Sequence, residues 1–130
     1  MKVIIKFVGI CATILGLVIG CAKESGINQT MEHALKQITS AKKLVTSTST
    51  VEEAKVNKEE LAQFGRAYAS AMDEISKLDQ TDRSESMEVT RWMPILAAEL
   101  QQLMLEINSM QARSPEAAAI IIPELKNFQR

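Results

Sequence analysis

Apolar residues recur every three or four positions in four segments of the chain, a spacing that places side chains on one face of an α-helix. We call such a row of apolar residues the seam of its helix. The first segment is predicted to run from a cap at Asn28 or Thr30 to about Val45. Its seam is Met31, Leu35, Ile38, Ala41 and Val45. The stretch from Thr46 to Thr50 is predicted as a loop, because its hydroxyl groups compete with helical hydrogen bonds.

The second segment has the most regular spacing, which is typical of helices packed nearly antiparallel at about 20°. Its seam is Leu61, Phe64, Tyr68, Ala71, Ile75 and Leu78. Thr50 stands three positions before Glu53, which predicts a capping box at the start of the helix. Gly65 lies inside it at a cost of about 1 kcal/mol relative to alanine. The polar stretch from Asp79 to Ser84 is predicted to break the helix.

The third segment keeps its spacing through Pro94, so the proline is predicted to kink the helix and not to divide it. Its seam is Val89, Met93, Leu96, Leu100, Leu103, Ile107 and Met110. We expect Leu100 and Leu103 in the core and Glu106 on the opposite side of the helix.

The fourth segment begins after Arg113. Ser114 is expected to cap it, and Pro115 takes the first helical position, where its missing N–H costs nothing. Its seam is Ala118, Ile121, Leu125 and Phe128. Pro123 is predicted to bend this helix.

Four amphipathic helices with short connections predict an all-α domain over residues 28–130. The expected arrangement is an up-down-up-down antiparallel four-helix bundle. Composition agrees, because after residue 20 only Gly26 and Gly65 remain as glycines, too few for a turn-rich β-protein. The alternative is a three-helix core with a loosely docked fourth helix, since the fourth segment is short and contains a proline.

The first 20 residues have a different pattern. Lys2 and Lys6 precede an apolar run over 7–20, which is typical of a secretory signal peptide and too short to span a bilayer. The run ends Leu-Val-Ile-Gly before Cys21, which matches a lipobox. We therefore predict a lipoprotein signal peptide over residues 1–20, a lipid anchor on Cys21 and a tether over residues 21–27. The alternative is an ordinary cleaved signal that ends near a cysteine by coincidence.

Acyl chains on Cys21 would hold the protein on a membrane. Ala22 follows the cysteine, in place of the aspartate that commonly retains lipoproteins in the inner membrane. In a Gram-negative cell this favours the periplasmic face of the outer membrane. Cys11 lies in the predicted signal peptide, so the mature protein would have no disulfide and would be held together by its core.

Charge and motifs narrow the possible functions. Without Lys2 and Lys6, the 15 basic residues fall to 13 against 16 acidic ones, a net charge of −3, so a nucleic-acid partner is not expected. His33 is the single histidine and is predicted on the surface. After residue 20 there is no His/Cys cluster at the spacing of metal ligands and no glycine-rich phosphate-binding loop. The adjacent pairs Glu52–Glu53 and Glu59–Glu60 fit a solvated face, so neither an enzyme nor a cofactor is expected.

Several short motifs resemble the cytochrome b-562 family of periplasmic four-helix bundles. Met31-Glu32 matches the pair that carries the axial methionine, and the stretch 61–64 is similar to the family's second helix. The stretch 87–96, with Arg91 inside it, is similar to the opening of the family's third helix, and 114–118 to that of the fourth. The resemblance implies a four-helix bundle in the periplasm, with haem b held between Met31 and a histidine near the chain end.

The chain departs from that family at its end. Residues 124–130 contain no histidine, and the Cys-x-x-Cys-His needed for covalent haem attachment is also absent. At most, Met31 carries over as one axial ligand. The sequence therefore predicts a non-catalytic, lipid-anchored envelope protein that contacts an unidentified envelope protein. A haem b-binding electron-transfer protein is the alternative.

Overall fold

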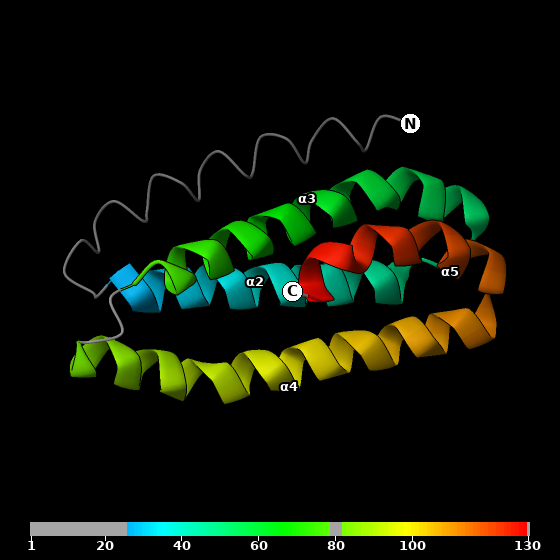
Figure 1. The fold of residues 1–130 in the computed structure, drawn as a ribbon. Coiled ribbons are helices and arrows are strands. Elements are labelled where there is room, and N and C mark those ends of the chain that lie inside the picture. Colours follow the sequence, from blue (N-terminus) through cyan, green and yellow to red (C-terminus); the bar gives the residue numbers. More distant parts are fainter. Residues whose placement is uncertain (1–25, 79–81, 130) are drawn as a thin grey trace.

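The computed structural model describes residues 26–78 and 82–129, which are helical almost throughout (Figure 1). The elements in chain order are α2 (Gly26–Ser47), α3 (Val51–Ser76), α4 (Arg83–Arg113), α5 (Pro115–Ile121) and the 3-10 helix η3 (Ile122–Gln129). No strand occurs among the described residues, so the predicted all-α class with four helices is confirmed. The predicted signal peptide and Cys21 lie outside these residues.

Helix α2 begins at Gly26, so the predicted tether over 21–27 is wrong in its last two residues. The reason is burial, because Ile27 lies in the core and a buried isoleucine contributes about 1.5–3 kcal/mol. Neither predicted cap residue caps the helix. Asn28 Oδ1 accepts a hydrogen bond from Trp92 Nε1 at 2.8 Å, and Thr30 Oγ1 donates to the carbonyl of Gly26 at 2.8 Å.

The corner between α2 and α3 is shorter than the predicted loop, because α2 continues through Thr46 and Ser47. The Thr46 hydroxyl donates to the carbonyl of Lys42, four residues back, at 2.8 Å, so it bonds within the helix and does not break it. The capping box at the start of α3 is confirmed. Thr50 Oγ1 accepts from the N–H of Glu53, and Glu53 Oε2 accepts from the N–H of Thr50, both at 3.2 Å.

Thr48, in this corner, is a fully buried polar residue. Its hydroxyl donates to the carbonyl of Leu44 at 2.7 Å and accepts from Asn57 Nδ2 at 2.9 Å. Both hydrogen-bonding roles of the hydroxyl are therefore used, which offsets the cost of removing it from water. The contact fixes the start of α3 on the end of α2.

The connection between α3 and α4 has the predicted length but lies two residues earlier in the chain. Helix α3 ends at Ser76, before the last predicted seam residue, Leu78, which still packs against the core. Helix α4 begins at Arg83, inside the stretch predicted to break the helix. Asp82 explains this start, because its Oδ1 accepts from the N–H of Ser84 at 2.9 Å and so caps the helix.

The prolines act in different ways. Helix α4 continues through Pro94, as predicted. At Pro123 the α-helix has already ended, at Ile121, and the chain continues as η3, because proline cannot donate to the carbonyl four residues back. Pro115 opens α5 as predicted. Ser114 stands at the cap position without a side-chain hydrogen bond, and its N–H closes α4 on the carbonyl of Met110 at 2.7 Å.

The four seams meet in a common core, as the spacing predicts. The fully buried large side chains include Met31, Ile38, Leu61, Leu96, Leu103, Met110 and Ile121. Several seam residues are not fully buried, and examples lie on α4. Leu100 is only partly buried, and Met93 is 45% exposed. Glu106 is not on the opposite side of the helix as expected, because it is half-buried and accepts from Thr46 Oγ1 at 3.2 Å.

Helix α2 packs against both α3 and α4, while α5 packs against α3 and α4. In Figure 1 the orange-to-red C-terminal segment lies between α3 and α4, and its end stops part-way along both helices. The α2–α4 contact includes the ion pair between Lys42 Nζ and Glu99 Oε2 at 2.8 Å, with both side chains 24% exposed. Within residues 26–78 and 82–129, no helix has the length and hydropathy needed to cross a membrane.

Candidate functional site

The residues considered for cofactor chemistry do not come together in one site. Met31 is fully buried in the core. His33 lies on the exposed side of α2, where its Nε2 is 3.5 Å from the Nε2 of Gln37. Met31 and His33 are therefore on different faces of the helix, as the spacing predicts. Cys21 lies outside the described residues.

Two residues of the acidic pairs on α3 take part in structural contacts. Glu52, Glu53, Glu59 and Glu60 are all exposed. Glu53 completes the capping box, and Glu59 Oε1 lies 3.3 Å from Arg66 Nη2. Among the described residues, no group of three or more His, Cys, Asp or Glu side chains is placed to hold a metal ion. These carboxylates form a solvated face, as predicted.

The C-terminal segment lies unusually close to α3 at Gly65. A Cβ atom at this position would be 3.2 Å from Asn127 Cβ and 3.4 Å from Phe128 Cε2. Glycine therefore lets η3 approach the helix backbone. One turn further along α3, the Tyr68 ring stacks on Phe128 with centroids 5.3 Å apart. These contacts place the end of η3 at the level of Tyr68.

Beyond that level α3 continues for about two helical turns to Ser76, and Leu78, the last residue of its predicted seam, follows the helix. There, α3 and the start of α4 form an open groove of about 330 Å³. We call this feature the open groove, and its apolar lining is Met72, Ile75, Leu78, Val89 and Met93. The first four are half-buried. By contrast, Leu61 is 0% and Leu103 is 1% exposed, at the levels where α5 and η3 cover the seams.

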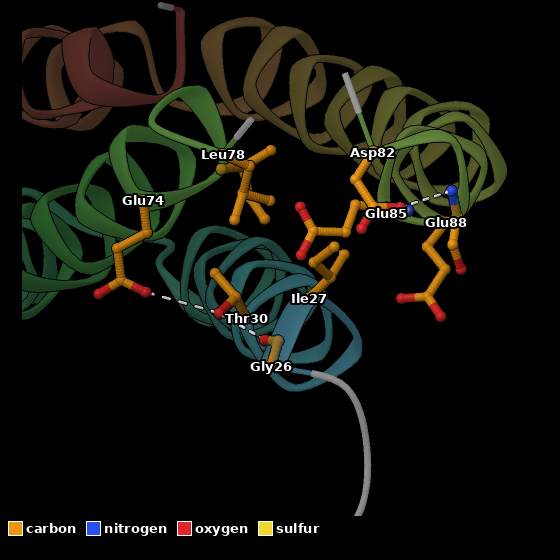
Figure 2. A pocket seen from close by; sticks show the side chains of 10 residues that line it. Gly26, Ile27, Thr30, Glu74, Leu78, Asp82, Glu85 and Glu88 are labelled. Carbon is orange, nitrogen blue, oxygen red and sulfur yellow. Dashed lines mark hydrogen bonds between the residues drawn. The ribbon is translucent and has the colours of Figure 1, made fainter. Parts of the chain in front are cut away.

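A second depression adjoins the open groove at the end of the bundle (Figure 2). Its volume is about 480 Å³, and it shares Ile75, Leu78 and Glu85 with the groove. Gly26 and Ile27, at the start of α2, form part of its wall. We call it the acidic depression after its carboxylates, Glu74, Asp82, Glu85 and Glu88. Among the described residues that line either feature, none is lysine or arginine.

Charged groups in and beside the acidic depression make contacts within the protein. Glu74 Oε2 accepts from Thr30 Oγ1 at 3.5 Å. Lys77, just outside the depression, has its Nζ 2.9 Å from Asp73 Oδ2 on the same helix. The hydrogen bond to Asp73, followed by the charges of Asp73 and Glu74, raises the pKa of Lys77. Because Lys77 is paired with Asp73, it does not pair with the carboxylates that line the depression.

The predicted seams include Ile75, Leu78, Val89 and Met93, so sequence reasoning placed most of the open groove in the core. The signal that could have revealed the groove is a difference in length. The fourth seam covers 11 residues (118–128), whereas the third covers 22 residues (89–110). A helix with the shorter seam cannot cover the whole of the longer one.

The open groove has the properties of a binding surface for apolar side chains. Its walls are apolar, and its polar edge is formed by Ser76, Glu85, Ser86 and Thr90. The same two helices pack against α5, and α3 also packs against η3. A groove with apolar walls and a polar edge recognises a ligand by its shape and its apolar surface. No protein-family model, curated protein or solved structure matches this chain.

Proposed function

We propose that this protein is a lipid-anchored envelope lipoprotein whose helical bundle acts without catalysis, by binding another envelope protein through the open groove. The observation that carries the proposal is the continuation of the α3 and α4 seams past the end of η3. Scattered exposed apolar residues are ordinary, but a contiguous apolar patch with a polar rim is typical of a protein interaction site. The open groove is such a patch.

The proposed anchor would bring this patch close to the membrane. Cys21 would carry the lipid after removal of residues 1–20, on the periplasmic face of the outer membrane in a Gram-negative cell. Gly26 lies five positions after Cys21, a distance that an extended chain spans in at most about 18 Å. Because Gly26 also lines the acidic depression, that end of the bundle would face the membrane.

For the bundle itself we propose the up-down-up-down arrangement. Hydrogen bonds between α2 and α3 support opposite directions, since Thr30–Glu74 joins residues 44 apart and Thr48–Asn57 residues nine apart. Between α2 and α4 the separation changes little, from 64 for Asn28–Trp92 to 60 for Thr46–Glu106. A nearly constant separation supports a common direction for these two helices.

The groove proposal is tested by photocrosslinking in living cells, with a photoreactive amino acid at Met93 or at Met87. Both are methionines of α4 with high exposure, 45% and 60%, but only Met93 lines the groove. We expect a discrete crosslinked product with one envelope protein from position 93. It should be lost when Ile75→Glu adds a charge to the groove wall, and helicity should be checked in that variant. Equal products from positions 93 and 87 would contradict the proposal.

The anchor is tested separately with Cys21→Ser. We expect the variant to stay unprocessed or to lose its lipid, and any processed protein to leave the membrane fraction. Radiolabelled palmitate and membrane fractionation measure the two effects. A serine variant that is cleaved normally and still fractionates with membranes would show that Cys21 is not the anchor.

A further inference from the structure

We infer that the partner enters the open groove as an amphipathic helix that carries lysine or arginine beside its apolar face. In this arrangement the helix continues the line of η3 between α3 and α4, and its basic residues lie over the acidic depression. The inference rests on the proposed function and specifies the chemistry of its partner.

The first reason is that the same seams already bind a helical segment. Phe128, near the end of η3, stacks on Tyr68 of α3, and the open groove begins one turn further along that helix, at Met72. Residues of α4 from Glu85 to Met93 form the other wall, a length of about 12 Å. A helix of roughly eight to twelve residues would cover it, with apolar anchors three or four positions apart.

The second reason is charge. Four carboxylates and no lysine or arginine occur among the described residues that line the two features. Glu85 belongs to both features, so it would meet the flank of any helix in the groove. Opposite charges across an interface favour encounter and fix orientation. A basic flank therefore suits this groove better than a neutral or acidic one.

The same charges argue against two other occupants. The anchor would hold this end of the bundle near the membrane, but the acidic depression would keep anionic lipid headgroups out of the groove. A second copy of this chain would bring the same carboxylates, and the net charge of −3 predicted for the mature protein (13 basic against 16 acidic residues), to the interface. Met72 and Met93, with flexible thioether side chains, would let the groove adapt to the apolar anchors of a partner helix.

The test uses methionine-methyl NMR on the lipid-anchored protein in phosphatidylcholine nanodiscs. The first probe is a helical peptide with leucines at positions 1, 4, 8 and 11 and lysines at its flanks. The second is the same peptide with glutamates in place of the lysines. Met72 and Met93 report on the groove, while Met31 and Met110, which are fully buried, are internal controls for the fold.

We expect the lysine peptide to shift the Met72 and Met93 signals and leave the Met31 and Met110 signals in place. Its Kd should be about tenfold lower than that of the glutamate peptide, and the difference should shrink at high salt. Glu85→Gln should raise the Kd of the lysine peptide by about two- to fivefold. Glu60→Gln, on an exposed part of α3 outside both features, should leave it unchanged.

The other outcomes separate this inference from the proposed function. If both peptides bind the groove equally, helix binding stands and the basic partner is refuted. If neither binds and Met72 and Met93 shift when phosphatidylglycerol is added to the nanodiscs, the occupant is the membrane, and both proposals fail. If neither binds and those signals shift with protein concentration, the occupant is a second copy. If no condition moves them, the groove binds no helix, and both proposals also fail.

Discussion

Replacing Leu103 by alanine is expected to destabilise the bundle far more than the same replacement at Leu105, two positions along the same helix. Leu103 is 1% exposed and lies in the core, whereas Leu105 is 60% exposed. A buried leucine-to-alanine change costs about 2–5 kcal/mol, because apolar contact is lost and a cavity remains. An exposed change away from such features stays within about 0.5 kcal/mol.

In a domain of about one hundred residues, each kcal/mol shifts the melting temperature by about 4 °C. We therefore expect Leu103→Ala to lower the melting temperature by about 8–20 °C, and Leu105→Ala to change it by no more than about 2 °C. Circular dichroism of the protein without residues 1–21 measures both values. Leu105 is a suitable control because it is exposed, whereas the neighbouring Glu106 contacts α2. Equal melting temperatures for the two variants would show that the α4 seam is assigned to the wrong face.

Three further predictions concern single side chains. Thr48→Val should cost about 1–3 kcal/mol in urea denaturation, because Asn57 loses its buried acceptor, whereas Thr90→Val, which loses a similar bond on the exposed surface, should cost little. Burial raises the pKa of Tyr68 above 10.0, so the neutral form is favoured in the fold and stability should fall as the pH rises from 10.0 through the raised pKa. Tyr68→Phe should remove the part of the stability loss that comes from ionisation of Tyr68. An identical loss of stability at alkaline pH in both proteins would refute the raised pKa of Tyr68. The mature protein made with haem available should show no Soret band, because Met31 is fully buried in the core, and a stoichiometric haem b spectrum that is lost in Met31→Ala would contradict this.

The sequence predicted the helical segments well, because seam spacing and capping are local properties. The Thr50–Glu53 box needs only four consecutive residues, and continuity through Pro94 follows from the unbroken seam. Helix ends were predicted less well, since packing decides them. Ile27 is helical because the core buries it, and Thr46 is helical because its hydroxyl bonds to a carbonyl of the preceding turn.

The candidate site could be predicted only in part. Apart from Met72, the apolar residues of the open groove belong to seams that the sequence shows, so their apolar character was visible. Their exposure was not, because it depends on where η3 ends relative to α3, which the close approach at Gly65 determines. The acidic depression combines the start of α2 with residues of α3 and α4. A single sequence contains no signal that brings Gly26 beside Glu74 and Glu85.

The open groove is best understood by comparison with other exposed apolar residues of the protein. Val56 is 74% exposed and lines neither of the two features, and single residues of this kind carry no functional meaning. Val89 and Met93 differ, because they keep the seam spacing of α4 beyond the part that α5 covers. A polar residue at Met93 would suit a bundle that stands alone, since it would remove apolar surface from water. An unbroken seam without a covering helix is the pattern of a surface that a second helix completes, and that is why we place the partner there and not at the larger acidic depression.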